Sequence, residues 1–239
     1  MLGVDPRTAM PGLWSLKPQD VLGLVFWTKN PTNLIEDAHL LKDFPLVVHV
    51  TLTGWTEVEH GAPNIKWGLK RIQELVQVLG PEKVIWRFSP VPAVPDVVDR
   101  FRTIAKSIEA LGLSQVYVSF LQTNDLMPEL RSIKMQQDIL CQMADLTSLQ
   151  VLVCNENRSL EGLERKVLNL GYGVCEDGRR FTGENLSEGL LPEGCGCALA
   201  VDPFTITESC SMGCTYCYAA DLTLAVGKRD TTRKLQVAS

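Results

Sequence analysis

Short apolar runs alternate with helix-like segments along most of this chain. Runs rich in Val, Ile, Leu, Phe and Trp, typical of buried strands, cover residues 23–28, 46–52, 83–88, 115–120 and 149–153. Apolar periodicity and helix end signals predict helices over residues 34–41, 65–78, 96–111, 132–144 and 160–170. Strands that alternate with helices form a parallel sheet with right-handed crossovers. We therefore expect an α/β fold, and the alternation fits both a barrel and a flavodoxin-like open sheet.

Three cysteines lie close together late in the chain. Cys210, Cys214 and Cys217 have the spacing C-x3-C-x2-C, and Tyr216 directly precedes the third of them. Thiolates this close can bind one [4Fe–4S] cluster, and three ligands leave one iron open for chemistry. The alternatives are a structural zinc site, which normally has four closed ligands, and a disulfide-linked turn. The spacing favours the cluster.

The cysteine spacing and Tyr216 resemble the signature of the radical S-adenosylmethionine (SAM) superfamily. The resemblance implies ligand roles for Cys210, Cys214 and Cys217, and an adenine contact for the backbone or ring of Tyr216. In that superfamily the cluster holds SAM at its open iron and reduces it, which releases a 5'-deoxyadenosyl radical. The superfamily usually carries this loop near the N-terminus, after the first barrel strand. Here the loop follows residue 209.

The position of the cysteine loop near the C-terminus points to a particular family with this motif. Together with VFWTKNP at residues 25–31, VIWR at 84–87 and CGC at 195–197, it resembles an uncharacterised bacterial and archaeal family whose C-terminal cysteines mimic the radical SAM motif. The resemblance spans about residues 12–222 and implies a cofactor but no substrate. Members tend to have an extra N-terminal segment without a counterpart here, so we expect a shorter variant or an incomplete start.

The resemblance implies an open (β/α)6 partial barrel, a circularly permuted radical SAM-like core with the cluster loop near the C-terminus. Residues 197–206 are predicted to form its sixth strand, which leads into the cysteine loop. We expect a single domain over residues 1–239. Its parts are an irregular lead-in at 1–20, a β/α core at 21–170, a cysteine-rich segment with the cluster strand at 171–222 and a basic tail at 223–239.

Composition limits the class of protein. The net charge of -5 argues against a strongly basic nucleic-acid surface, although a nucleic-acid substrate stays open. The sequence shows neither a secretory signal pattern nor a run of 18 apolar residues, so we expect a cytoplasmic protein without a membrane partner. Thiols stay reduced in the cytosol, where clustered cysteines are typical of metal ligands.

Polar residues at predicted strand ends are candidates for binding SAM. Active sites of parallel α/β folds gather at the C-terminal ends of the strands. The candidates are Lys29, Asn30, Arg87, Ser119, Asn155 and Glu156. Lys29 and Arg87 suit the SAM carboxylate, and Asn or Glu suits the ribose; the alternative is that both cations pair with surface acids. The superfamily's usual Gly-Gly-Glu strand end, which grips the SAM amino group, is absent.

Four further cysteines suggest a second site. Cys154, Cys175, Cys195 and Cys197 could bind a second Fe–S cluster or a zinc ion, or Cys154 and Cys175 could be small buried residues. Cys141 lies on an apolar helix face and is predicted to be a core residue. His49 alternates with two valines, which favours a strand histidine with satisfied hydrogen bonds over a catalytic base.

The first functional hypothesis is a radical SAM enzyme that acts on an unknown small molecule or peptide and receives electrons from a partner such as flavodoxin or ferredoxin. The second is a non-enzymatic metal protein. It would be either a structural zinc module with Cys195, Cys197, Cys214 and Cys217 as ligands or an Fe–S electron-transfer protein. Tyr216 and the C-x3-C spacing speak against zinc, because Cys210 would be left over.

Overall fold

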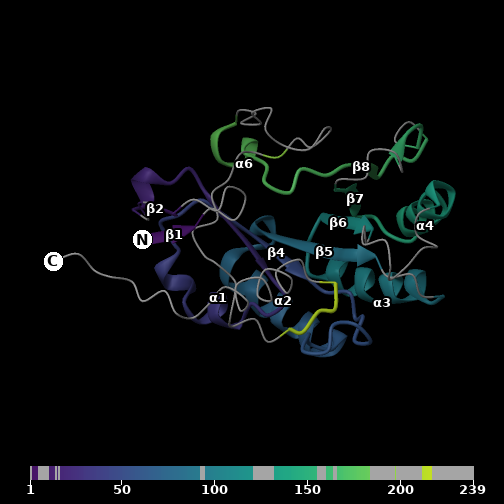
Figure 1. Cartoon of the computed structure of the whole chain (residues 1–239), viewed down its shortest axis with the longest axis horizontal. Helices are drawn as coiled ribbons and strands as arrows, with labels where there is room; N and C mark the ends of the chain where they lie inside the picture. The colour runs from purple at the N-terminus through teal and green to yellow at the C-terminus, as the bar shows by residue number, and fades with distance from the viewer. Residues whose placement is uncertain are drawn as a thin grey trace, which may run out of the picture.

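The computed structural model describes residues 2–4, 11–13, 15, 17–91, 95–120, 132–154, 160–163, 166–183, 197 and 212–216. Within them, six strands form one parallel sheet in the order in which they occur along the chain (Figure 1). The strands are β3 (Leu24–Thr28), β4 (Leu46–Thr51), β5 (Val84–Val91), β6 (Gln115–Phe120), β7 (Gln150–Val153) and β8 (Leu170–Tyr172). The predicted α/β fold with an open parallel sheet of six strands is confirmed.

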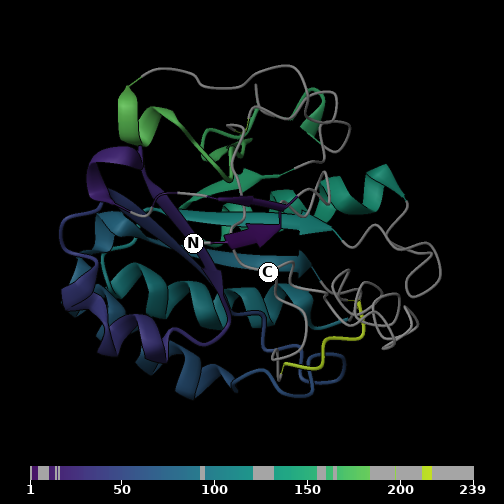
Figure 2. The ribbon, with the colours of Figure 1, turned by 60° about the vertical axis from the view of Figure 1, so that its left-hand side comes forward.

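Helices cover one face of this sheet (Figures 1 and 2). They are α1 (Thr32–Glu36), α2 (Ile65–Leu79), α3 (Val97–Ala110) and α4 (Ile133–Asp145), with short 3-10 turns η1 (Pro18–Asp20), η2 (Ala38–Leu40) and η3 (Pro81–Lys83). Asn64 caps α2, since its side-chain oxygen accepts from the Trp67 amide at 2.9 Å. Apolar side chains of the helices and strands form the main core.

The chain crosses to the other face of the sheet after β8. There the short helix α6 (Arg179–Thr182) lies opposite the helical layer, which Figure 2 shows. The ring of Phe181 packs so closely on Gly23 that a Cβ atom at position 23 would lie 2.4 Å from it, so the contact requires glycine. This face has a smaller core with Val47, Ile85 and Tyr117. We call it the inner face, and the helix-covered side the outer face.

Of two predicted elements in the second half of the chain, one is wrong and the other lies almost entirely outside the described residues. The predicted helix over 160–170 is wrong: Leu160 is helical, a turn with Gly162 at φ +78° follows, and β8 begins at Leu170. The sixth strand of the sheet is β8, beside β7. Of the predicted strand over 197–206, all but Cys197 lies outside the described residues.

Three differences concern the first half of the chain. The lead-in, predicted irregular, contains two short antiparallel strands, β1 (Leu2–Val4) and β2 (Pro11–Leu13). The predicted helix over 34–41 is split into α1 and η2, and α1 already begins at Thr32. Strand β5 continues past its predicted end, since its pairing with β6 resumes at Val91 after a register shift.

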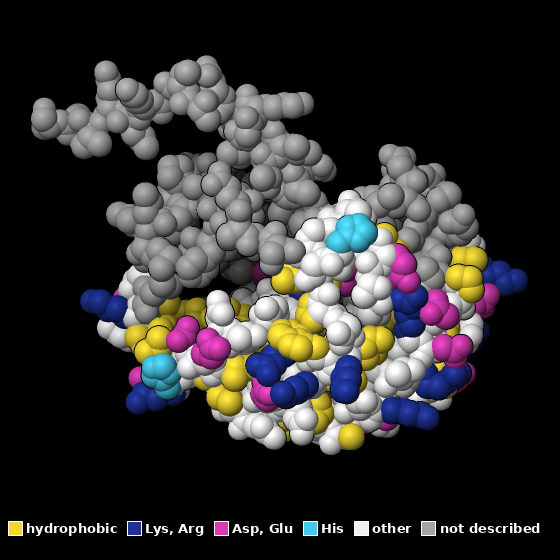
Figure 3. All heavy atoms as spheres, turned by 90° about the horizontal axis from the view of Figure 1, so that it is seen from below, with side chains coloured by type: hydrophobic (Ala, Val, Ile, Leu, Met, Phe, Trp, Pro, Cys, Tyr) yellow, Lys and Arg dark blue, Asp and Glu magenta, His cyan; other side chains and the backbone are white. Residues whose placement is uncertain are grey.

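The surface over the helices is of mixed charge. Figure 3 shows this face, where Lys and Arg side chains are interspersed with Asp and Glu over the described residues. No helix in the described ranges is both long and apolar enough to cross a membrane.

Candidate functional site

The described part of the cysteine loop, residues 212–216, docks on the loop that follows β4. Glu59 and Cys214 form an antiparallel bridge. The Thr215 amide donates to the Val58 carbonyl at 2.9 Å, and the Gly61 amide donates to the Met212 carbonyl at 2.8 Å. Parallel strands place all their C-terminal ends at one edge, and the loop lies at the edge toward which the strand arrows point in Figure 2. The cysteine loop is thus fixed at the strand ends.

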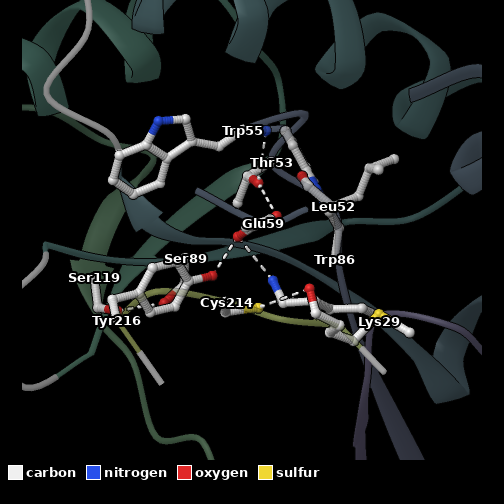
Figure 4. A network of polar contacts seen from close by, with 11 residues as sticks. Lys29, Leu52, Thr53, Trp55, Glu59, Trp86, Ser89, Ser119, Cys214 and Tyr216 are labelled. Atoms are coloured by element: carbon white, nitrogen blue, oxygen red, sulfur yellow. Dashed lines mark hydrogen bonds and ion pairs between the residues drawn. The ribbon is translucent and has the colours of Figure 1, made fainter. Parts of the chain in front are cut away.

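A buried carboxylate holds this loop in place (Figure 4). Glu59 is 2 % exposed and accepts from three groups. Thr53 Oγ1 lies 2.8 Å from Glu59 Oε2, Lys29 Nζ lies 2.8 Å from Oε1, and the Tyr216 hydroxyl donates to Oε1. Because a buried carboxylate is costly unless paired and hydrogen-bonded, these contacts stabilise one arrangement of strand ends and loop.

Aromatic packing supports the same contact. The rings of Trp55 and Tyr216 stack with centroids 5.8 Å apart and planes at 15°. The Lys29 ammonium lies 5.9 Å from the Tyr216 ring centroid. Burial raises the pKa of Tyr216 well above its ordinary value, and the charge of Glu59 adds to the effect. Tyr216 therefore stays protonated and donates its hydroxyl hydrogen to Glu59.

The predicted cluster ligands are only partly described. Cys214 is half-buried in the docked loop, while Cys210 and Cys217 lie outside the described residues. In the described ranges, no three His, Cys, Asp or Glu side chains form a group that could hold a metal ion. The structure therefore leaves the predicted cluster as a prediction.

The predicted SAM-binding residues fall into separate places. Lys29 pairs with Glu59, and Asn30 Oδ1 accepts from the Thr32 amide at 3.1 Å, where it supports the start of α1. Ser119 Oγ is hydrogen-bonded to Ser89 Oγ. Arg87 points onto the inner face. Asn155 and Glu156 lie outside the described residues. The structure brings only Lys29 and Tyr216 together.

Three of the four second-site cysteines meet on the inner face. Cys175 and Cys197 are buried there, and Cys154 packs against the same cluster; Cys195 lies outside the described residues. A hydrogen bond with Cys154 raises the pKa of Cys175 to about 11, although a second one with Cys197 lowers it. Cys175 is therefore a neutral thiol near pH 7. The helix cysteine Cys141, predicted as core, is half-buried.

His49 is also on the inner face, and its hydrogen bonds are not satisfied as predicted. It is 1 % exposed, and neither ring nitrogen has a hydrogen-bond partner among the described residues. Its ring packs edge-on against Trp27 and Tyr117, with centroids 6.1 and 5.3 Å away. Burial, with the positive charges of Arg87 and Arg180, lowers the pKa of His49 from 6.5 to about 3.

Sequence reasoning did not identify Glu59 as a site residue. It lies in a loop without any motif, 30 residues from Lys29 and 157 from Tyr216. No spacing rule links such positions, because the fold alone brings them together. The one available signal was the position of Thr53 and Glu59 just after a predicted strand end, where parallel folds gather functional groups.

Solved structures with weak similarity to this chain include three enzymes. A structure described as a putative phosphonomutase from Burkholderia cenocepacia is 12 % identical, with a TM-score of 0.42, over 63 % of this chain and 64 % of that one. A variant of NCR from Zymomonas mobilis is 16 % identical (TM-score 0.39, 66 % of this chain and 57 % of that one). A morphinone reductase mutant in complex with tetrahydroNAD is 14 % identical (TM-score 0.40, 72 % and 51 %).

This chain thus spans less than two thirds of each of those three structures. Among curated proteins, the comparison finds no match. A family model does match, and it extends over residues 7–219, which include the strands of the sheet, Glu59 and all eight cysteines. The chain belongs to the family described as Domain of unknown function (DUF1848).

Proposed function

We propose that this chain is a radical SAM enzyme whose cluster loop is the segment 210–217. The docking of that loop at the C-terminal edge of a parallel sheet, through the bridge between Glu59 and Cys214, is the observation that carries the proposal. Parallel α/β folds collect their active sites at this edge. A loop that served only as a surface turn would not need a buried carboxylate to hold it.

The donor set fits an iron–sulfur cluster. Cys210, Cys214 and Cys217 would hold it, since thiolates are its usual ligands. Cys214 is half-buried, so its thiol is shielded by the protein and still within reach of a bound group. A cluster held by these cysteines would supply one electron to SAM, which would split into methionine and a 5'-deoxyadenosyl radical able to take hydrogen from the substrate.

The chain's own residues give the loop a fixed orientation. Glu59 holds Tyr216 and Lys29 at once, and the stack on Trp55 restricts the Tyr216 ring. Such support from neighbouring groups keeps a binding site at its working geometry. Because Trp55 covers a face of the ring, the backbone of Tyr216 is the better candidate for the adenine contact. Among the other proposed SAM contacts, Ser119 is hydrogen-bonded to Ser89, which follows Arg87 by two residues along β5.

In the proposed permuted core, the strand before the cysteine loop would be a seventh strand beside the six described. This core requires the segment before Cys210 to pair along the outer edge of β3, and β3 pairs only with β4 among the described strands. The strand after which the superfamily places its cluster loop would then be the last of this chain. Electrons would come from a reducing partner such as flavodoxin or ferredoxin.

Cluster content and SAM cleavage test the proposal. The protein is purified without oxygen, iron and sulfide are measured, and EPR spectra of the dithionite-reduced protein are recorded before and after SAM is added. 5'-Deoxyadenosine is quantified in parallel. We expect about four irons per chain, a spectrum that shifts with SAM, and 5'-deoxyadenosine formation. In Cys214→Ala all three should be lost, whereas Cys141→Ala, a substitution on α4, should keep them.

Three outcomes would contradict the proposal. Zinc with little iron would favour the structural metal module. A cluster whose spectrum ignores SAM would favour an electron-transfer protein. SAM cleavage that persists in Cys214→Ala would show that the cysteine loop does not hold the cluster that cleaves SAM.

A further inference from the structure

The inner face of the sheet carries a cation, Arg87, that has no carboxylate partner among the described residues. Arg87 leaves β5 on this face and crosses β4, so that its guanidinium lies 5.0 Å from the centroid of the Trp27 ring on β3. Its Nη1 donates to Cys175 Sγ at 3.2 Å. These contacts place the guanidinium among aromatic rings and a thiol.

Most of the described arginines differ from Arg87 in this respect. Of the six described arginines, four form an ion pair with a carboxylate, whereas Arg87 and Arg180 do not. The four are Arg71, Arg100, Arg102 and Arg179. Arg180 instead donates to Gln115 and lines a pocket of about 190 Å³ at the N-terminal ends of β5 and β6, with Glu82 among its walls. Arg87 and Arg180 thus both have neutral partners among the described residues, and Arg87 is the one whose guanidinium lies against an aromatic ring of the sheet.

No carboxylate among the described residues neutralises Arg87. Its contacts there are the Cys175 sulfur and the Trp27 ring, and the neighbouring rings of His49 and Tyr117 are not acids. A half-buried guanidinium without a counter-charge is unfavourable, because burial removes part of its hydration. An anion bound to the guanidinium would offset this lost hydration through a charge-assisted hydrogen bond. A guanidinium also offers a planar pair of donors that matches a carboxylate or a phosphate.

The guanidinium lies beside an exposed aromatic side chain, that of Trp27. That ring is 51 % exposed, which is uncommon for tryptophan on a sheet face and leaves an aromatic surface beside the cation. On the inner face, the exposed Trp27 ring thus packs on the buried ring of His49, which in turn packs on the buried ring of Tyr117. A ligand could place its anionic group on Arg87 and an apolar or planar part on Trp27.

This place lies next to the proposed cluster loop. Arg87 pairs in register with Thr51, the last residue of β4. Thr53 follows two residues later, roughly 7 Å along an extended chain, and it already contacts Glu59, which holds Tyr216. The guanidinium points from there toward the middle of the inner face, away from the strand ends. A molecule held by Arg87 would therefore lie on the inner face, set back from the strand ends at which the cysteine loop docks.

We propose that Arg87 and Trp27 form a binding site for the anionic group, carboxylate or phosphate, of a small-molecule substrate. This assigns Arg87 to the substrate in place of the SAM carboxylate. The substrate role rests on the proposed function, while the anion site itself is independent of cluster chemistry.

Arginine labelling on the whole wild-type chain tests the site. Phenylglyoxal reacts with guanidinium groups, and peptide mass spectrometry gives the rate at each arginine. The reaction is run at constant ionic strength with inorganic phosphate, succinate, SAM or, as the neutral control, succinamide. We expect phosphate or succinate to slow labelling of Arg87 about fivefold at four times its Kd, the factor 1 + [L]/Kd. Succinamide and SAM should leave the rate unchanged, as should every anion at Arg100, which is held by Glu57 and Asp96.

The arms separate the possible anions. Protection by phosphate alone would identify a phosphorylated substrate, and protection by succinate alone would identify a carboxylic acid. Protection by SAM as strong as by either probe would overturn the substrate assignment, because Arg87 would then hold the cofactor. If no anion slows the labelling of Arg87, the proposed anion site is wrong, and Arg87 has only a structural contact with the cysteines of the inner face.

A binding measurement keeps the test independent of labelling. Isothermal titration with the protective anion should give a Kd at least about tenfold weaker in Arg87→Gln, since a charge-assisted bidentate pair is lost, and nearly unchanged in Arg180→Gln. Circular dichroism checks that both variants fold. If iron and SAM cleavage are absent while Arg87 still binds the anion, the proposed function fails and the anion site stands. If SAM cleavage is normal but Arg87 binds no anion, the proposed function stands and the anion site fails.

Discussion

The two faces of the sheet are built from the same strands and differ in kind. On the outer face, Val48 and Trp86 are fully buried under helices. One residue further along the same strands, His49 and Arg87 point to the inner face, where one lacks hydrogen-bond partners and the other lacks a carboxylate among the described residues. Because successive strand residues point to opposite faces, one step along the chain separates groups that stabilise the fold from groups suited to bind a ligand.

Truncating the outer face should have the largest effect on stability. Phe101 on α3 is fully buried, with its ring 5.2 Å from that of Trp86 and 5.4 Å from that of Phe88. We expect Phe101→Ala to lower the free energy of unfolding by about 3–5 kcal/mol, from lost burial and the cavity left behind. Trp27→Ala on the inner face should cost less than about 1 kcal/mol, because the ring is half exposed. Equal losses in urea denaturation would show that the faces do not differ as described.

Removing the charge of Glu59 should have the next largest effect. Glu59→Gln leaves the Lys29 ammonium without its partner, at 15 % side-chain exposure, and weakens the contact of Tyr216. We expect a loss of about 2–4 kcal/mol in the free energy of unfolding, and a lower iron content after anaerobic reconstitution. Glu57→Gln is the matched control in the same loop. Its carboxylate is 54 % exposed beside Arg100, so its removal should cost less than about 1 kcal/mol.

Both effects can be read from denaturant curves and iron analysis. A Glu59→Gln variant that matches Glu57→Gln in stability and in iron content would show that the buried carboxylate does not hold the cysteine loop.

The inner face should also make stability depend on pH. The pKa of His49 is lowered from 6.5 to about 3 by folding, so the unfolded chain binds one more proton between these values. The contribution is complete above pH 6.5 and is lost as the pH falls toward 3. Between pH 6.5 and 5 we expect a loss of roughly 1.5 kcal/mol that His49→Gln does not show.

Urea denaturation at several pH values measures this slope. The exposed His39→Gln variant should keep the slope of the wild-type chain. A His49→Gln variant with that same slope would mean that His49 is charged inside the fold.

The smallest effect is expected at the cap of α2. Asn64→Ala removes the acceptor for the Trp67 amide and should cost about 1 kcal/mol. Because this cap belongs to the helical layer, the labelling rate of Arg87 should not change. A thermal melt together with the labelling assay checks both points, and a changed labelling rate would show that the two faces are coupled through α2.

Much of the fold could be predicted from the chain. The five predicted strands exist, because runs such as those of β4 and β6 are apolar enough to be buried on both faces. Strand β8 could not be predicted, since its three residues include a glycine and carry no readable pattern. Its pairing is decided by the exposed edge of β7, which is a tertiary effect.

The site was less accessible to sequence reasoning. Lys29 was predicted from its place after a strand, and the structure puts it beside the cysteine loop, although Glu59 binds its charge. Asn30 was predicted for the same reason, but local hydrogen bonds to Thr32 use its side chain. A strand end marks where groups gather, and only the neighbours along other segments decide what each group does.

The bridge between Glu59 and Cys214 joins positions about 155 residues apart. A ribosome that adds roughly 5–20 residues per second needs about 8–30 s to pass from one to the other. The segments that bear Lys29, Thr53 and Glu59 leave the ribosome long before Cys214 does. During synthesis the docking site for the loop is therefore available first, and the proposed cluster would be assembled only at the last stage of the chain's maturation.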